Sequence, residues 1–468
     1  MNNPTQVAVI GAGISGLACA YRLQQLGLDV TVFESNDCAG GLIDSVQKED
    51  LLFEAGPQSF QGTPTLLALI RELGLEPQLQ KADPRAPRYV LLHGRLRKIP
   101  MSPQALLAST LLNPVSRWKI ATEPFKKSQP PTEEESVAAF VRRKFGNEIL
   151  EYLVAPFVSG VYAGDPEKLS LKAAFPTLDE WERQYGSVLR GAMKSRPHKE
   201  QRAGAPPLCS FTHGVATLPR AMAAKLGDAM QYETRAVSVD FARAGEQRHT
   251  AAAVGLACEI RFVRNGQEQS AIAGAVVIAT PAYAAARLLE TSSPHLAQAL
   301  SGIAYAPVAV VACTYYRQQV GDPLEGFGFL VPRGEKVRTL GTVWNSSLFP
   351  GRAHEGSVTI TSFIGGATDP EIMNLHEENI AAIVAEENAR ILGITGPPVE
   401  VAVWKYPRAL PQYNLGHGHI VETIRDAERA SPGLFFAGNY LEGPAVGKCV
   451  ENGFQTAEAV SKYLQIAR

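Results

Sequence analysis

Hydrophobic residues at the start of the chain form a continuous run and then recur at helical spacing. The apolar run at 7–10 ends in a glycine-rich stretch, and apolar positions over 17–26 follow a helical period. Gly27 ends that pattern, and a β-rich run over 29–34 finishes in a carboxylate. The first 34 residues therefore predict one strand–helix–strand unit.

Further along, helical and strand patterns occupy separate parts of the chain. Apolar spacing predicts a helix over 64–73 and a helical insertion from 102 to about 191, without clear strand patterns. Residues 187–207 are rich in Arg, Lys, Gly and Pro without a period, which predicts an irregular, mobile connection. Asn265-Gly266 predicts a hairpin turn. Strands are expected at 259–263, 275–279, 309–312, 358–361 and 434–438, and helices at about 379–392 and 450–464. Strand-to-helix turns near both ends of the chain suggest that the two ends complete one nucleotide-binding domain.

The composition narrows the classes of function. The 468 residues are 45% hydrophobic and 19% charged, which is typical of a globular chain rather than a disordered or polytopic membrane protein. A net charge of −1 supplies no global field for nucleic acid, so no nucleic-acid partner is expected. Six scattered cysteines without a C-x-x-C pair favour a reducing, cytoplasmic compartment. No charged-then-apolar leader precedes residue 7, so we expect a protein that works where it is made, or a mature form.

A G-x-G-x-x-G motif follows the first strand and opens the first helix. Gly11 permits the tight turn, Gly13 lets the backbone approach a pyrophosphate, and Gly16 permits close helix–strand packing. Glu34 ends the second strand, where a carboxylate can accept hydrogen bonds from ribose hydroxyls and would repel a 2′-phosphate. No second such motif follows a strand, so we predict one dinucleotide site and no separate nicotinamide domain.

Later stretches carry a resemblance to a known family. They are FEAGP (53–57), RYV (88–90), GVYAGD (160–165), GFGFLVP (326–332), LGT (340–342), FIGG (363–366), PQY (411–413) and PGLFFAGN (432–439). Together with the glycine motif, they make the chain resemble, nearly end to end, the oxygen-dependent protoporphyrinogen oxidases. The resemblance implies non-covalent FAD and the six-electron oxidation of a porphyrinogen to a porphyrin by O2, with H2O2 as by-product.

The resemblance also implies an α/β (α+β) fold. A Rossmann-like FAD-binding domain would be interleaved with a mixed-sheet substrate domain and a helical, membrane-associating insertion. The implied boundaries are 1–87 for the first part of the FAD domain, 88–101 for a substrate-domain segment, 102–191 for the insertion, 192–300 for the return, 301–405 for the substrate domain and 406–468 for the last part of the FAD domain.

Two sets of site residues follow from the motifs and the resemblance. The expected cofactor contacts are Gly11, Gly13, Ile14, Ser15, Gly16, Glu34, Ser35, Gly40, Gly41, Gly56, Pro57, Gln58, Val237, Trp404, Gly438, Asn439 and Val446. The expected substrate contacts are Arg88, Phe327, Leu330, Val343 and Phe363, with Arg88 as the partner of a propionate. No catalytic side chain is nominated, because the flavin performs hydride transfer. Gln58 stands where some animal members have an arginine, so a second charged contact is not assumed.

Other partners and functions stay open at this point. The resemblance implies peripheral contact with the cytoplasmic face of a membrane, and it leaves room for a homodimer and a transient contact with ferrochelatase. The alternatives are a coproporphyrinogen III oxidase of the same fold, an amine oxidase or carotenoid desaturase, and a non-catalytic flavin-binding module. An amine oxidase or carotenoid desaturase would be expected to lack Arg88 and the 326–332 stretch, and bleaching of a yellow protein by porphyrinogen would exclude the non-catalytic module.

Three remaining features could each have a functional or a purely structural role. His417 and His419 form an H-x-H pair in a predicted glycine-rich loop, but no third ligand is nearby, so no metal is expected. The basic residues at 126–127 and 142–144 fit a solvated helix face better than a lipid contact. The apolar segment 105–112 is too short to span a bilayer, which leaves core packing or shallow interfacial insertion.

Overall fold

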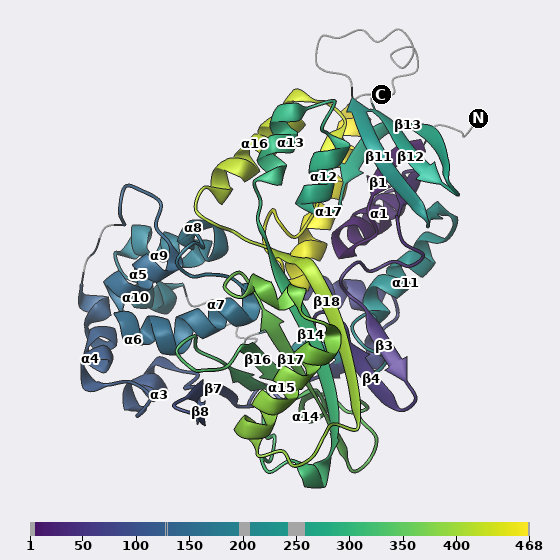
Figure 1. Ribbon diagram of the computed structural model, residues 1–468. Helices are drawn as coiled ribbons and strands as arrows, with labels where there is room; N and C mark the ends of the chain where they lie inside the picture. The colour runs from purple at the N-terminus through teal and green to yellow at the C-terminus, as the bar shows by residue number, and fades with distance from the viewer. Residues whose placement is uncertain (1–4, 127, 129, 196–205, 242–257, 467–468) are drawn as a thin grey trace.

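The computed structural model describes residues 5–126, 128, 130–195, 206–241 and 258–466, and within them the chain forms two seven-stranded sheets (Figure 1). The first sheet has the order β10-β2-β1-β13-β12-β11, and β19 pairs with β13. Its strands are β1 (Thr5–Ile10), β2 (Val30–Phe33), β10 (Met230–Gln231), β11 (Thr234–Phe241), β12 (Cys258–Arg264), β13 (Gln267–Ile278) and β19 (Leu434–Phe436). The predicted strands at 7–10, 29–34 and 434–438 are confirmed, with shifts of one or two residues at their ends.

Five strands of this sheet, namely β10, β2, β1, the second half of β13 and β19, run parallel and end in register. Ile10 of β1 pairs with Phe33 of β2 and with Ile278 of β13, and Ile278 pairs with Phe436 of β19. The helices around the sheet are α1 (Ile14–Gln25), α2 (Pro64–Glu72), α11 (Thr217–Leu226), α12 (Ala282–Leu288), α13 (Pro294–Ser301), α16 (His417–Ala430) and α17 (Val446–Ile466). Helices from the two ends of the chain, α1 and α17, pack against each other, so both ends contribute to this half of the molecule.

The segment expected to hold two separate strand runs, at 259–263 and 275–279, differs from the prediction. Asn265 and Gly266 form the expected turn, with φ of +51° and +73°. The strand that returns from the turn continues into the buried run as one strand, β13. Its first half pairs antiparallel with β12 and its second half parallel with β1. The two halves look unrelated in sequence because the first is mostly exposed and the second is buried.

The second sheet has the order β18-β14-β17-β16-β15-β7-β8. Its strands are β7 (Arg88–Leu92), β8 (Arg95–Lys98), β14 (Tyr305–Tyr316), β15 (Gly328–Leu330), β16 (Thr339–Val343), β17 (Ser357–Gly365) and β18 (Glu400–Pro411). Helix α15 (Glu377–Leu392) covers one face, where Val311 and Ile360 pack with Ile380 and Val384. The short helix α14 (Asn345–Leu348) follows β16. Smaller sheets pair β3 (Ser45–Lys48) with β4 (Leu51–Glu54), and β9 (Leu208–Phe211) with β5 (Phe60–Gln61) and β6 (Leu79–Lys81).

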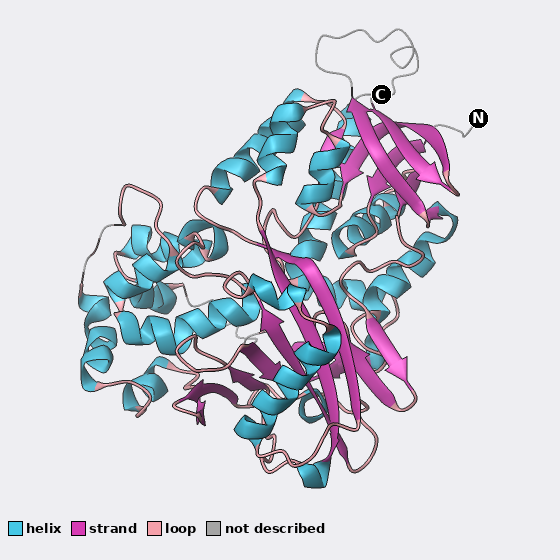
Figure 2. Ribbon diagram, viewed as in Figure 1, coloured by secondary structure: helices cyan, strands magenta, loops and turns pink. Residues whose placement is uncertain are grey.

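The predicted helical insertion is confirmed as a helical region, drawn at the left of Figure 2. Its helices are α3 (Pro103–Ala108), α4 (Pro114–Thr122), α5 (Val137–Lys144), α6 (Asn147–Ile149), α7 (Ala155–Tyr162), α8 (Leu171–Ala174), α9 (Pro176–Tyr185) and α10 (Val188–Lys194). The interpretation of 187–207 as irregular is wrong at its start, because the Ser187 side chain accepts from Arg190 N and caps α10. Residues 196–205 lie outside the described residues.

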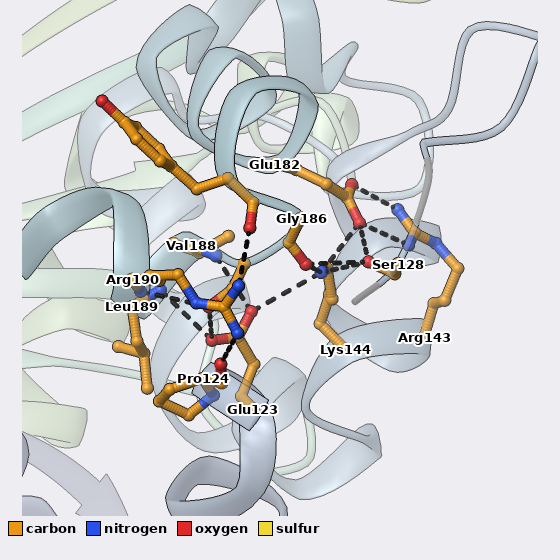
Figure 3. A network of polar contacts seen from close by, with 12 residues as sticks. Glu123, Pro124, Ser128, Arg143, Lys144, Glu182, Gly186, Val188, Leu189 and Arg190 are labelled. Atoms are coloured by element: carbon orange, nitrogen blue, oxygen red, sulfur yellow. Dashed lines mark hydrogen bonds and ion pairs between the residues drawn. The ribbon is translucent and has the colours of Figure 1, made fainter. Parts of the chain in front are cut away.

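A buried ion network joins four elements of this region (Figure 3). The wholly buried Glu182 of α9 lies 2.8 Å from both Arg143 Nη1 and Lys144 Nζ of α5. Glu123, in the 3₁₀ turn Glu123–Phe125, accepts from Val188 N at 2.9 Å and lies 3.5 Å from Lys144 Nζ. Burial alone would raise the pKa of Glu182, but its bonds to Arg143 and Lys144 outweigh burial and lower the pKa to about 2. The Glu182 carboxylate therefore remains charged at neutral pH.

Replacing Lys144 tests whether this network stabilises the fold. Lys144→Met leaves two buried carboxylates without their shared cation, so we expect the free energy of unfolding in urea to fall by about 3 kcal/mol at pH 7. Arg142→Met is the matched control, because Arg142 pairs with Glu167 at the exposed surface and should contribute less than about 1 kcal/mol. Since the folded pKa of Glu182 lies below its ordinary value of 4.5, the stabilisation should be lost as pH falls from about 4.5 toward 2. Equal losses in the two variants would contradict the account.

Candidate functional site

The residues that follow β2, β1, β13 and β19, four neighbouring parallel strands of the first sheet, lie in a row. Gly11 N donates to Phe33 O at 2.8 Å, and Ala279 N donates to Ile10 O at 2.8 Å. Ala437 N donates to the carbonyl of β13's last residue at 3.1 Å. In sheets of this kind, ligands bind beyond the carboxyl ends of the parallel strands. This edge, which carries the glycine motif, is therefore the nucleotide side of the candidate site.

The three motif glycines have different surroundings. A Cβ on Gly11, which has φ of +103°, would lie 3.0 Å from Ala279 O, and a Cβ on Gly16 would lie 2.0 Å from Gly11 O. The fold itself therefore requires Gly11 and Gly16. A Cβ on Gly13 would have no described atom within 4 Å. Gly13 leaves open space at the start of α1, where the next residues, Ile14 and Ser15, are buried.

Glu34 is tied to the glycine loop. Its Oε2 accepts from Ala12 N at 2.7 Å, and its Oε1 accepts from Asn36 N at 2.9 Å and from Ser35 Oγ at 3.2 Å. A carboxylate has about four acceptor positions, so ribose hydroxyls can still bind it. Its negative charge disfavours a 2′-phosphate beside it, as the sequence predicts.

Two further glycine segments that the sequence predicts as cofactor contacts, 40–41 and 56–58, lie close to the G-x-G-x-x-G motif. Gly40 N donates to Ala12 O at 2.9 Å, and Gly40 forms a bridge with Gly13. Gly41, with φ of +61°, would place a Cβ only 3.5 Å from Gly13 Cα. A Cβ on Gly56 would lie 1.9 Å from the carbonyl oxygen of the residue after Gly41, so no other residue fits there. The structure thus brings 11–16, 40–41 and 56–58 together.

A buried ion pair joins this glycine cluster to the second sheet. Glu54, the last residue of β4, lies 3.4 Å from Nη1 of Arg352, and each side chain is 1% exposed. Glu54 also accepts from Ser45 Oγ and, at 3.0 Å, from Val215 N, while Arg352 Nη2 donates to Ser210 Oγ at 2.5 Å. Burial raises the pKa of Glu54 and lowers that of Arg352, and their mutual attraction opposes both shifts.

Gln58 makes a second connection between the two halves. Its Nε2 donates to Gly56 O at 2.8 Å and to Glu54 O at 3.1 Å, which folds the segment after Pro57 back on itself. Its Oε1 accepts from Asn345 Nδ2 of α14 at 2.6 Å. Asn345 Oδ1 is buried without a hydrogen-bond partner among the described residues.

One face of the second sheet turns toward this segment, opposite the face covered by α15. Sheet register places four predicted substrate residues on it, namely Arg88, Leu330, Val343 and Phe363. Val343 is buried and packs with Phe363 and Phe327, the fifth predicted residue. The exposed Arg88 guanidinium lies 5.2 Å from the centroid of the Phe327 ring. The structure therefore gathers an apolar surface with Arg88 at its edge, and register places the exposed Arg95 and Arg97 of the edge strand β8 on the same face.

The remaining predicted contacts lie around this surface. Trp404 of β18 shares the face, and its ring centroid is 6.4 Å from that of Phe53. Leu330 meets α7, where a Cβ on Gly160 would lie 2.5 Å from Leu330 Cδ2. Val237 is 43% exposed at a bulge in β11. That strand begins at Thr234, whose N–H donates to Glu34 O at 2.8 Å, so Val237 lies on the Glu34 side.

The end of the chain supplies the other predicted residues of the nucleotide edge. Gly438 N donates to Asn452 Oδ1 at 3.0 Å, and Asn439 follows it. Val446 is buried at the start of α17. Sequence reasoning missed Asn452, and it missed Thr280, whose Cγ2 would lie 3.3 Å from a Cβ on Gly11 and whose Oγ1 is buried without a described partner. The signal for Thr280 was its place directly after a buried strand, at the ligand edge.

The interpretation of His417 and His419 as loop residues is wrong. Both lie in the first turn of α16, because Gly416, with φ of +87°, turns the chain into that helix. His417 is 3% exposed, and its Nε2 lies 2.9 Å from Tyr440 O. In the described ranges, no group of three or more His, Cys, Asp or Glu side chains is placed to hold a metal ion.

Comparison with known proteins agrees with this geometry. Residues 14–461 match the family of flavin-containing amine oxidoreductases, and the chain belongs to that family. It is 34% identical to the chloroplastic protoporphyrinogen oxidase of Nicotiana tabacum, over 97% of this chain and 85% of that one. It is 27% identical to the coproporphyrinogen III oxidase of Bacillus subtilis (strain 168), over 98% of each chain. A crystal structure from Exiguobacterium sp. 255-15, provisionally named a protoporphyrinogen oxidase, matches with a TM-score of 0.80 at 21% identity, over 99% of this chain and 100% of that one.

The chain is therefore a flavin-dependent oxidoreductase, and its cofactor is FAD. The residues present fit this cofactor. Gly13 leaves free space at a helix N-terminus, where a pyrophosphate is stabilised, and Glu34 suits a ribose. The unpartnered Thr280 Oγ1 beside Gly11 supplies a further polar contact at the same edge.

The open space at Gly13 allows a test that separates cofactor binding from folding. Gly13 has φ of −68°, so Gly13→Val should fold normally while its side chain occupies the pyrophosphate space and abolishes flavin binding. Gly334→Val is the matched control, because Gly334 is also open but lies in a loop of the second sheet. Acid precipitation should release all flavin from the wild type, since we expect non-covalent FAD, and none from Gly13→Val. Retention of yellow colour in the wild-type pellet, or full flavin content in Gly13→Val, would contradict this account.

Proposed function

We propose that this enzyme oxidises protoporphyrinogen IX to protoporphyrin IX in tetrapyrrole biosynthesis. Three two-electron rounds remove six electrons and six hydrogens, and three O2 molecules take them up as three H2O2. The observation that carries the proposal is the apolar face of the second sheet, with Arg88 at its edge, joined to the glycine cluster. The names of the relatives from plants support the same substrate.

Each part of the molecule has its own role in the proposed reaction. The first sheet and its helices hold FAD, the second sheet holds the porphyrinogen, and the 102–191 insertion contacts a membrane. The boundaries expected from the resemblance remain part of the proposal. FAD, when bound, supplies the hydride acceptor and passes the electrons to O2. The protein's own residues bind and orient the substrate and exclude water.

The substrate's shape and charge explain the residues of the surface. A porphyrinogen is a large, mostly apolar macrocycle with anionic carboxylates, so it needs a wide apolar surface and a cation at the rim. Phe327, Val343 and Phe363 supply the apolar contacts, and Leu330 closes the end beside α7. Arg88 supplies the cation, since its guanidinium contacts an aromatic ring and no described carboxylate pairs with it.

Coproporphyrinogen III is the second candidate substrate. The relative from Bacillus subtilis bears that name and aligns over nearly the whole chain. Coproporphyrinogen has four propionates, whereas protoporphyrinogen has two propionates and two vinyl groups. A mostly apolar surface favours the substrate with fewer carboxylates, because each unpaired carboxylate loses hydration on binding. We therefore favour protoporphyrinogen.

The helical insertion has the surface expected of a peripheral membrane contact. Five large apolar side chains of the insertion and two that flank it are exposed: Val115, Trp118, Phe125, Phe157 and Val161, with Met101 before it and Met193 after it. Phe125 is 84% exposed, and the Lys126 ammonium lies 5.1 Å from the Trp118 ring centroid. Within the described ranges, no helix combines the length and the hydropathy needed to cross a bilayer. We infer a contact with an anionic, cytoplasmic membrane face through these side chains. The homodimer and the ferrochelatase contact stay predictions.

Substitution of Arg88 tests the substrate assignment. Removing a partly desolvated, charge-assisted bond costs about 1.5–3 kcal/mol, so Arg88→Ala should lower kcat/KM for protoporphyrinogen about ten- to a hundredfold. Flavin content should stay unchanged. Arg85→Ala is the control, since Arg85 is highly exposed and pairs with Asp83. Equal kcat/KM values for Arg88→Ala and wild type, or a wild type equally active on both porphyrinogens, would refute Arg88 as the propionate anchor.

Substitution of Phe125 tests the membrane contact. Phe125→Ser should weaken binding to anionic liposomes by about ten- to a hundredfold, because a buried aromatic side chain contributes about 1.5–3 kcal/mol. Val399→Ser is the control, since Val399 is exposed on another part of the surface. Binding is measured by liposome flotation at low and high salt, and salt should release part of the wild type. Unchanged flotation of Phe125→Ser would exclude this surface as the contact.

A further inference from the structure

Two side chains from the segment 413–417 form hydrogen bonds to two consecutive backbone carbonyls after β19. The Tyr413 hydroxyl donates to Asn439 O, and His417 Nε2 lies 2.9 Å from Tyr440 O. The two ring centroids are 4.4 Å apart. Tyr413 is 1% exposed and His417 is 3% exposed, so both contacts are shielded from water.

The chemistry of these contacts defines the state of His417. A carbonyl oxygen only accepts hydrogen bonds, so Nε2 must carry the proton that it donates to Tyr440 O. Nδ1 is buried without a described partner, and burial lowers the pKa of His417. The ring is therefore a neutral donor in a dry environment, and it makes a structural contact.

The segment held in this way belongs to the nucleotide edge of the first sheet. Gly438 and Asn439 follow Ala437, the residue after β19 that register places level with Gly11 after β1. On its other side, Gly438 N is held by Asn452 Oδ1 of α17 at 3.0 Å. A short backbone segment fixed from two helices and one strand end has little freedom to shift relative to a ligand at that edge.

The segment 413–417 also forms hydrogen bonds to the helical insertion. Tyr413 O accepts from Ser170 N at 2.8 Å, and the Tyr413 and Tyr162 ring centroids are 5.9 Å apart. Gly416 N donates to a carboxylate oxygen of Glu134 at 2.7 Å. Tyr413 and His417 thus lie between the insertion and the segment at the nucleotide edge.

We propose that Tyr413 and His417 are positioning residues, which set the Gly438–Asn439 backbone against the flavin and so control its reactivity. The proposal rests on the proposed function, because it takes Gly438 and Asn439 as flavin contacts. Neither side chain exchanges protons or electrons with the substrate. Each acts by holding a carbonyl, which orients the peptide groups beside the cofactor.

Four holoenzyme variants test this role. Tyr413→Phe and His417→Leu each remove one donor, His417→Gln restores an amide donor, and Tyr315→Phe is the matched control. Tyr315 is 1% exposed on the α15 side of the second sheet, and its hydroxyl has no described hydrogen-bond partner. For each variant we would measure flavin content, thermal stability, the visible spectrum and reduction potential of bound FAD, and anaerobic flavin reduction by protoporphyrinogen.

Tyr413→Phe and His417→Leu should keep their flavin but show a shifted spectrum and potential, and a flavin reduction rate about three- to tenfold lower per bound flavin. His417→Gln should recover most of the wild-type values, and Tyr315→Phe should match the wild type. Lower thermal stability with wild-type spectrum and potential would overturn the proposal, since it shows a merely structural role. The spectrum and potential need no porphyrinogen, so they decide the positioning role even if protoporphyrinogen fails to reduce the wild-type flavin, a result that would refute the proposed function.

Discussion

The ion pair between Glu54 and Arg352 determines how the two sheets meet. Both charges are removed from water, and each loses hydration that a single contact at 3.4 Å does not fully offset. The pair persists because Ser45, Val215 and Ser210 supply further hydrogen bonds from three other segments. The cofactor segment that begins after Glu54 is thereby fixed against the sheet that carries the apolar surface. This ion pair and the Gln58–Asn345 hydrogen bond together hold the glycine cluster against the half of the molecule that carries Arg88.

The local parts of the fold could be predicted from the sequence, because their signals lie within a few residues. The strand–helix–strand unit at the start, the Asn265-Gly266 turn and the helical insertion all follow from spacing and turn chemistry. Two features escaped prediction. β13 joins an exposed half to a buried half, so its two patterns look like separate strands. Helix α10 depends on the Ser187 side chain and on the distant Glu123, neither of which changes the hydrophobic pattern.

In the candidate site, too, local contacts could be predicted from the sequence and distant contacts could not. Gly11, Gly16 and Glu34 have roles that the motif spacing predicts, since the contacts run through the adjacent strand ends. The substrate residues came from resemblance, and sheet register alone explains why four of them share a face. Arg352 and Asn345 could not be found, because their partners lie 298 and 287 positions away in the chain. His417 was misplaced in a loop, because a single left-handed glycine begins α16 without an ordinary capping residue.

The central claim is that a flavin edge and an apolar porphyrinogen surface form one site. The most direct test is anaerobic mixing of the wild-type holoenzyme with protoporphyrinogen IX or coproporphyrinogen III, with flavin bleaching and porphyrin fluorescence followed together. The account predicts that protoporphyrinogen bleaches the flavin faster, and that protoporphyrin and H2O2 form once O2 is admitted. A flavin that neither porphyrinogen reduces would contradict the claim, and faster reduction by coproporphyrinogen would contradict the choice of substrate.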